Sequence, residues 1–185
     1  MKALIVIDFT NDFVDGNLPV GKPAIDIQKT IAELTRLYSD RGDFVVMAVD
    51  LHEQDDAFHP ETKLFPPHNI RGTRGRELYG ELQQVYEGRK DTIYWMDKTR
   101  YSAFCGTELN QKLRERGITE VDLVGVCTDI CVLHTAVDAY NYGYKITVYE
   151  DGVASFNPEG HKWALSHFQG SLGAAVVRSE EFLNR

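Results

Sequence analysis

Cys127 and Cys131 lie in the stretch GVCTDICV (125–132), where an apolar run gives way to a helical pattern. A helix that begins near Thr128 would place Cys131 in its first turn, beside unpaired backbone N–H groups and the positive end of the helix dipole. Both effects favour a thiolate, and the same N–H groups can stabilise an oxyanion. The sequence therefore predicts Cys131 as a nucleophile and the backbone of Cys127 and Cys131 as oxyanion donors.

The cysteines have other interpretations. A free cysteine is commonly a small buried hydrophobic residue, which is the alternative for Cys131. Cys105 has no partner in the pattern and is assigned a structural role. Cys127 and Cys131 could instead serve a metal- or redox-sensing protein that is not an enzyme, although thioredoxin-like pairs have two intervening residues rather than three. The odd total of three cysteines indicates reduced thiols and predicts a cytoplasmic protein.

Two charged residues close apolar runs elsewhere in the chain. Asp8 ends KALIVID (2–8), and Lys98 ends DTIYWMDK (91–98). Taken alone, the aspartate is typical of a turn and the lysine of a solvated surface. If both side chains reach the thiol, they supply a proton acceptor and a compensating cation. His134, one turn after Cys131, is expected to be a packed or partly exposed helix residue.

A metal site is predicted after the apolar run DFVVMAVD (43–50). Asp50 and His52 are two positions apart in an extended chain, so their side chains fall on one side. His68 follows, with His59 and Glu61 between, in a segment without periodicity (51–75), and long loops of this kind are usually functional. Imidazole and carboxylate ligands suit zinc, iron or manganese, whereas the alternative is a polar loop with surface histidines.

Strand-like and helical segments alternate along the chain. This alternation predicts a three-layer α/β/α fold with a six-stranded, mainly parallel sheet, which is a Rossmann-like arrangement. Strands are expected at 2–8, 43–50, 91–98, 119–126, 144–151 and 173–182, helices at 24–42, 107–117, 128–143 and 157–169, and a short helix or turn at 76–88. Ligands bind beyond the carboxyl ends of parallel strands, so four strand ends are expected to bring the polar residues to one edge.

The composition fits one globular domain of residues 1–185. Hydrophobic residues make up 43% of the chain, and 20 basic against 28 acidic residues give a formal net charge of −8. This charge disfavours nucleic acid as a partner, so a small-molecule substrate is expected. No apolar stretch reaches the length of a membrane span, and the N-terminal run MKALIVIDFT is typical of a buried strand rather than a signal peptide.

Four stretches resemble the nicotinamidase (pyrazinamidase) branch of the isochorismatase-like cysteine hydrolases: VIDFTNDF (6–13), DLH…PPH (50–68), DKTRYSAF (97–104) and GVCTDICV (125–132). They follow the family's order and spacing and extend over most of the chain. The resemblance implies an isochorismatase-like fold and metal-dependent hydrolysis of nicotinamide to nicotinate and ammonia, in NAD salvage, through a thioester on Cys131. Another small amide or ureide is the alternative substrate.

The resemblance also assigns site residues. It implies a catalytic set of Asp8, Lys98 and Cys131. It implies one divalent ion, with zinc preferred over iron or manganese, held by Asp50, His52, Glu61 and His68. For the one ligand position that varies within the family, Glu61 is chosen over His59.

Further expectations follow from the same resemblance. Three aromatic residues correspond to positions that hold the substrate ring: Phe13, Phe65 and Tyr101. A cis peptide bond is expected between Val126 and Cys127. Relatives of this fold often associate, which implies a homo-oligomer.

Overall fold

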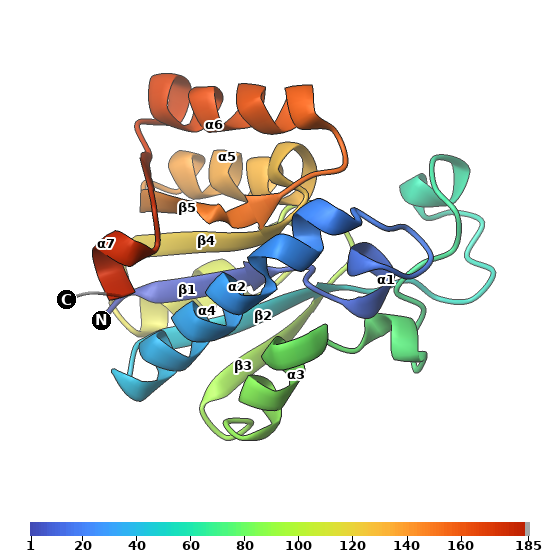
Figure 1. The fold of residues 1–185 in the computed structure, drawn as a ribbon, viewed down its shortest axis with the longest axis horizontal. Coiled ribbons are helices and arrows are strands. Elements are labelled where there is room, and N and C mark those ends of the chain that lie inside the picture. The colour runs from blue at the N-terminus through green and yellow to red at the C-terminus, as the bar shows by residue number, and fades with distance from the viewer. Residues whose placement is uncertain (184–185) are drawn as a thin grey trace.

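A single six-stranded sheet forms the centre of the protein (Figure 1), and its strand order is β3-β2-β1-β4-β5-β6. The computed structural model describes residues 1–183, so the end of the predicted domain 1–185 lies outside the described residues. The strands are β1 (Ala3–Ile7), β2 (Phe44–Asp50), β3 (Ile93–Lys98), β4 (Glu120–Val126), β5 (Lys145–Ala154) and β6 (Ala175–Val177). The predicted sheet is confirmed, and within the described residues every pairing between its strands is parallel.

Helices cover both faces of the sheet, which explains why every residue of β1 and β2 is buried. One face packs against α2 and α3, and the other against α4, α5 and α6. The helices are α1 (Asn11–Val14), α2 (Lys22–Asp40), α3 (Gly80–Glu87), α4 (Leu109–Glu115), α5 (Leu133–Asn141), α6 (Pro158–Leu172) and α7 (Glu180–Leu183). Within residues 1–183, none of them combines the length and apolar character needed to cross a membrane.

Three local features differ from the expectations. The last strand was expected at 173–182, but β6 covers only Ala175–Val177, because Ser179 turns to bond Asp151 through both its N–H and its hydroxyl group. The helix expected at 128–143 begins as a π-helical segment, η3 (Thr128–Val132), before α5 continues it. The four-residue helix α1 was not predicted, because so short a segment has no measurable periodicity.

Gly125 marks the closest approach between β4 and β1, where it lies opposite Ile7. Its φ is +120°, and a Cβ atom at this position would lie 2.0 Å from the Ile7 carbonyl oxygen. Only glycine fits such a conformation and such a contact. Because Asp8 directly follows Ile7, this approach sets the spacing of the two strands just below the polar edge.

We expect Gly125→Ala to lower the free energy of unfolding by roughly 2–4 kcal/mol, because the added methyl group must displace backbone atoms. Gly170→Ala is the matched control, since a Cβ there would meet nothing within 4 Å on the exposed side of α6. That control should gain about 0.5–1 kcal/mol from helix propensity. Urea denaturation measures both, and an unchanged midpoint for Gly125→Ala would contradict the close approach.

Candidate active site

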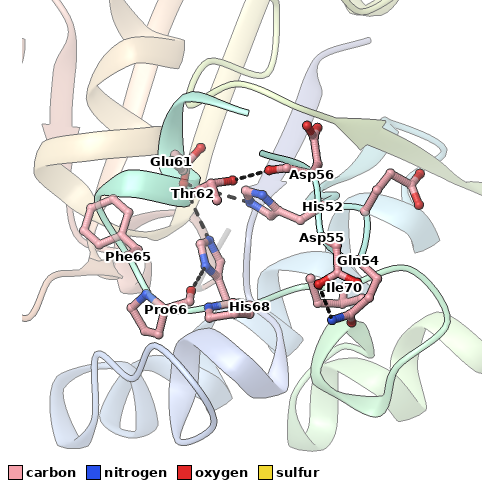
Figure 2. A pocket seen from close by; sticks show the side chains of 12 residues that line it. His52, Gln54, Asp55, Asp56, Glu61, Thr62, Phe65, Pro66, His68 and Ile70 are labelled. Carbon is pink, nitrogen blue, oxygen red and sulfur yellow. Dashed lines mark hydrogen bonds and ion pairs between the residues drawn. The ribbon is translucent and has the colours of Figure 1, made fainter. Parts of the chain in front are cut away.

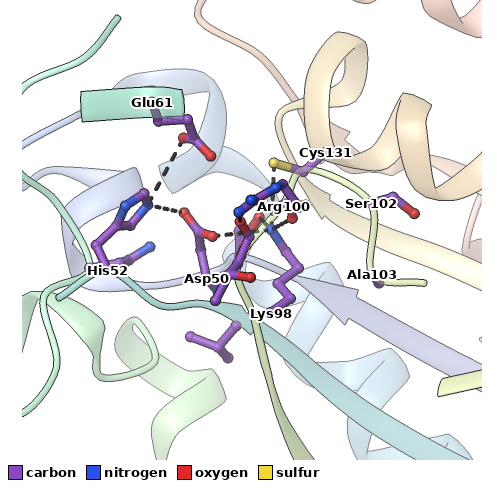
Figure 3. Close-up of polar contacts among 12 residues, drawn as sticks. Asp50, His52, Glu61, Lys98, Arg100, Ser102, Ala103 and Cys131 are labelled. Atoms are coloured by element: carbon purple, nitrogen blue, oxygen red, sulfur yellow. Dashed lines mark hydrogen bonds and ion pairs between the residues drawn. The ribbon is translucent and has the colours of Figure 1, made fainter. Parts of the chain in front are cut away.

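The three neighbouring strands β1, β2 and β3 bring three charged residues together at their carboxyl ends. Asp8 follows β1, and the last residues of β2 and β3, Asp50 and Lys98, lie opposite each other in the register. Lys98 Nζ lies 2.7 Å from Asp8 Oδ2 and 3.7 Å from Asp50 Oδ1. Figure 3 shows the Lys98 side chain reaching toward Asp50 and Cys131. The sheet therefore places the three residues in contact, as the position of the strand ends predicted.

Asp8 is completely buried and adopts a φ of 55°, a left-handed conformation that aspartate tolerates better than most residues. Its Oδ1 accepts a hydrogen bond of 2.8 Å from the backbone N–H of Asp50. Burial raises the pKa of Asp8 to about 6, against the opposing effect of the Lys98 ammonium group. At neutral pH the carboxylate is therefore mostly ionised and can accept a proton.

Lys98 carries a buried positive charge. Burial opposes this charge, but Asp8, Cys131 and Asp50 together raise the pKa of the ammonium group above its ordinary value. Its Nζ donates to the carbonyl oxygen of Arg100 at 3.1 Å and lies 3.8 Å from Cys131 Sγ. The lysine thus remains a cation that contacts both the carboxylate and the sulfur atom.

Cys131 lies within η3 and is buried. Burial raises the pKa of its thiol well above the ordinary value; Lys98 lowers it, whereas Asp8 and Asp50 raise it further. The expectation that the start of the helix favours a thiolate is therefore wrong. Burial and two carboxylates raise the pKa of the thiol by more than one ammonium group lowers it. A nucleophilic role for Cys131 then requires a base that removes its proton, and Asp8 is the adjacent ionised group.

Cys127 differs from Cys131 in its surroundings. The peptide bond between Val126 and Cys127 is cis, which confirms the expectation. Within residues 1–183 the backbone N–H of Cys127 forms no hydrogen bond, so it is free to donate. The side chains of Cys127 and Cys131 belong to the two hydrophobic cores on opposite faces of the sheet. This separation disfavours their interpretation as a redox pair.

Beside this group, four side chains form a compact set of metal-type ligands: Asp50, His52, Glu61 and His68. Their ligand atoms all lie within 4.8 Å of one another, and all four residues are buried. His52 Nε2 lies 2.7 Å from Asp50 Oδ2, and His68 Nε2 lies 3.5 Å from Asp50 Oδ2 and from Glu61 Oε2. The alternative of a polar loop with surface histidines does not fit these buried residues.

The chemistry of these side chains fits a divalent cation. His68 Nε2 and Asp50 Oδ1 are buried without a hydrogen-bond partner in the described residues. His68 Nδ1 lies 2.8 Å from the Pro66 carbonyl oxygen, which fixes the ring with Nε2 toward the carboxylates. Although burial opposes it, the carboxylates of Asp50 and Glu61, each 3.5 Å from Nε2, raise the pKa of His68 to about 10. The site thus favours positive charge, and two imidazoles with two carboxylates suit a metal such as zinc.

His59 lies outside this set. Its Nε2 lies 2.9 Å from the Thr99 carbonyl oxygen, and its Nδ1 accepts from the Glu61 backbone N–H at 3.2 Å. Both ring nitrogens are therefore engaged where η1 (Pro60–Lys63) begins. The His59 ring packs 4.2 Å from the His52 ring, but it is Glu61 that places a ligand atom among those of the other three residues.

A cavity of about 150 Å³ opens beside the metal-type ligands and is lined in part by His52, Glu61, Phe65 and His68 (Figure 2). The ring of Phe13 lies 5.1 Å from that of His68, and the ring of Phe65 lies 6.3 Å from it. Tyr101 packs instead against His134 at 5.2 Å. Cys131 does not line the cavity. His52 in the cavity wall contacts Asp50, Asp50 lies beside Lys98, and Lys98 lies beside the Cys131 thiol.

Sequence reasoning missed the residues that hold the loop in place. Asp12 on α1 accepts from the Asn69 backbone N–H at 2.8 Å, and the Thr10 hydroxyl donates to the Asn69 side chain at 2.9 Å. These bonds fix the position next to His68. The only signal in the sequence is the polar stretch TND that follows Asp8 and Phe9, and nothing in it indicates a partner so far along the chain.

Fold and site together define an α/β protein that binds a small ligand beyond the carboxyl ends of its strands. A family profile described as Isochorismatase domain matches residues 2–181. The chain belongs to the isochorismatase family.

Individual relatives are similar over nearly their full length. The Bacillus subtilis isochorismatase family protein PncA is 59% identical over 180 residues, which are 95% of this chain and 98% of that protein. A crystal structure of nicotinamidase/pyrazinamidase PncA from Bacillus subtilis superposes with a TM-score of 0.94 at 60% identity, covering 96% of this chain and 100% of that one. Pyrazinamidase of Pyrococcus horikoshii in complex with zinc gives a TM-score of 0.83 at 29% identity, covering 96% and 98%.

Proposed function

We propose that this protein hydrolyses nicotinamide to nicotinate and ammonia through a thioester on Cys131. One observation carries the proposal: Lys98 Nζ lies 2.7 Å from Asp8 and 3.8 Å from Cys131 Sγ, next to four buried metal-type ligands. A purely structural sheet has no need for a carboxylate, an ammonium group and a thiol in mutual contact. The similarity to the Bacillus subtilis nicotinamidase/pyrazinamidase supports the choice of substrate.

The proposed reaction uses the thiol as nucleophile and Asp8 as the proton carrier. Asp8 accepts the Cys131 proton, the sulfur attacks the carboxamide carbon, and Lys98 balances the charge of the pair. The backbone N–H groups of Cys127 and Cys131 donate to the oxyanion, and Asp8 returns the proton to the departing ammonia. Water, deprotonated by Asp8, then attacks the thioester, which releases nicotinate and restores the thiol.

The substrate ring would lie against the bound ion, with its carboxamide over Cys131. The proposed ligands of the ion are Asp50, His52, Glu61 and His68. When bound, the ion supplies an electron-pair acceptor for a ring nitrogen, and zinc is proposed because the Pyrococcus horikoshii relative was solved in complex with zinc. Phe13, Phe65 and Tyr101 would contact the ring. A reduced catalytic thiol also favours a cytoplasmic location, and we propose that copies of the chain associate.

Ammonia release from a panel of amides, with metal analysis of the same sample, tests the proposal. We expect turnover of nicotinamide to exceed that of benzamide, because benzamide has no ring nitrogen. A chelated, metal-free sample should lose at least about tenfold in kcat/KM for nicotinamide, equivalent to about 1.4 kcal/mol, and should regain it with zinc. The metal-free sample must keep its folded circular-dichroism spectrum for this comparison.

Two other results would favour a different function for this protein. Ammonia from a ureide but from no aromatic amide would favour the alternative of another small-amide hydrolase in the same fold. No ammonia from any amide, together with reversible oxidation of Cys127 and Cys131 that shifts metal affinity, would favour the sensing protein. Full activity after metal removal would contradict the ring-holding role of the ion.

A further inference from the structure

Arg76 is a largely buried cation that the proposed reaction does not use. It ends the short 3₁₀ helix η2 (Arg74–Arg76), and its side chain is 13% exposed. Its Nε donates to the Asp50 carbonyl oxygen at 2.8 Å, and its Nη2 donates to the Val49 carbonyl oxygen at 3.3 Å and to the Asp97 carboxylate. All three acceptors lie at the carboxyl ends of β2 and β3.

The guanidinium group lies behind the site, on the other face of the sheet. Side chains alternate along a strand, so Trp95 and Asp97 point to the face opposite Lys98. Trp95 packs with the core that contains Val49, whereas Met96 belongs to the core that contains Cys131. The guanidinium carbon of Arg76 lies 5.5 Å from the centre of the Trp95 ring. Arg76 therefore acts on the site through backbone atoms.

The hydrogen bonds of Arg76 matter for the end of β3 because β3 is an edge strand. β3 is the first strand in the sheet order, so it has only one neighbouring strand, β2. Beyond the paired residues, the Leu51 backbone N–H donates to the Lys98 carbonyl oxygen at 2.8 Å. Arg76 adds a link between the two strand ends, and its planar fork of donors suits several fixed acceptors in a way that a lysine does not.

We propose that Arg76 is a positioning residue that holds Asp50 in the orientation needed for metal binding. Asp50 is the ligand residue that also lies 3.7 Å from Lys98, so its backbone fixes the carboxylate between the metal-type ligands and the catalytic ammonium group. Removing a partner that orients a metal ligand typically lowers metal affinity about 10- to 100-fold. The inference rests on the metal centre of the proposed function.

Zinc affinity tests the role of Arg76 without any substrate. Arg76→Met removes all three hydrogen bonds and keeps an apolar stem beside Trp95. We expect its Zn²⁺ affinity, measured by competition with a chromophoric chelator, to fall about 10- to 100-fold. The visible spectrum of the Co²⁺-substituted protein should also change, because it reports ligand geometry. A residue with only a stabilising role would lower the melting temperature and leave the spectrum unchanged.

Arg74→Met is the matched control, because Arg74 is an exposed cation in the same 3₁₀ helix, and it should bind Zn²⁺ as the unmodified protein does. Wild-type affinity and a wild-type Co²⁺ spectrum in Arg76→Met would overturn the proposal. If that variant does not fold, Arg76→Lys keeps the charge but not the fork, and unchanged affinity there would overturn it equally. Failure of the unmodified protein to bind Zn²⁺ would instead overturn the metal centre itself, so the two failures are distinguishable.

Discussion

Cys131→Ala should lower the turnover of nicotinamide by roughly 10⁴- to 10⁶-fold while its zinc affinity stays unchanged. The substitution removes the only sulfur atom that Lys98 contacts in the described residues, at 3.8 Å, so no nucleophile remains beside Asp8. Cys131 is not one of the four clustered ligand residues, so metal binding should not depend on it. Ammonia release measures the first effect, and chelator competition measures the second.

Cys105→Ala provides the matched control for Cys131→Ala. Cys105 is exposed and Cys131 is buried, so the two variants separate loss of a thiol from loss of this particular thiol. The control should keep full turnover. Mass spectrometry of a rapidly quenched reaction should detect an acyl adduct in the control and none in Cys131→Ala. Substantial turnover by Cys131→Ala would exclude the thioester route.

Lys98→Met should lower the free energy of unfolding by about 3–5 kcal/mol and abolish turnover, because it leaves buried charge without its partner. The ammonium group lies 2.7 Å from Asp8 and 3.7 Å from Asp50, and neither the lysine nor Asp8 is exposed. Without it, two buried carboxylates would repel each other. Lys98 also lowers the pKa of Cys131, so its loss should slow alkylation of this thiol by iodoacetamide at neutral pH.

Lys162→Met makes the same chemical change at an exposed position. The side chain of Lys162 is 74% exposed on α6, and its ion pair with Glu159 spans 3.9 Å. This variant should change the free energy of unfolding by less than about 0.5 kcal/mol. Guanidinium denaturation of both proteins gives the comparison. Equal stability of the two variants would show that the charge of Lys98 is not needed inside the fold.

Much of the fold and the place of the site could be predicted from the sequence because both depend on local patterns. Alternating apolar runs and helical periodicity located five of the strands closely, and the carboxyl ends of parallel strands meet by necessity at one edge. Asp8, Asp50 and Lys98 each stand where a run ends, so their convergence followed from the sheet. Resemblance added the choice of Glu61, which the geometry of the loop supports.

Other features depend on contacts that no local pattern contains. Burial and the carboxylates at the ends of two strands raise the pKa of Cys131, so the position of the thiol in a helix was a poor guide. Arg76 reaches Asp50 across 26 residues, and Asp12 reaches Asn69 across 57. Such pairs become visible only once the chain is folded.

The two carboxylate oxygens of Asp50 face different neighbours. Oδ2 lies 2.7 Å from His52, and Oδ1 lies 3.7 Å from Lys98. Replacing Asp50 to suit another metal or substrate would also change the charge beside Lys98, and with it the proposed thiol chemistry, because the effects of substitutions at contacting residues are not independent. Substitutions that change ligand preference are therefore expected first among residues of the outer cavity wall and only later at Asp50.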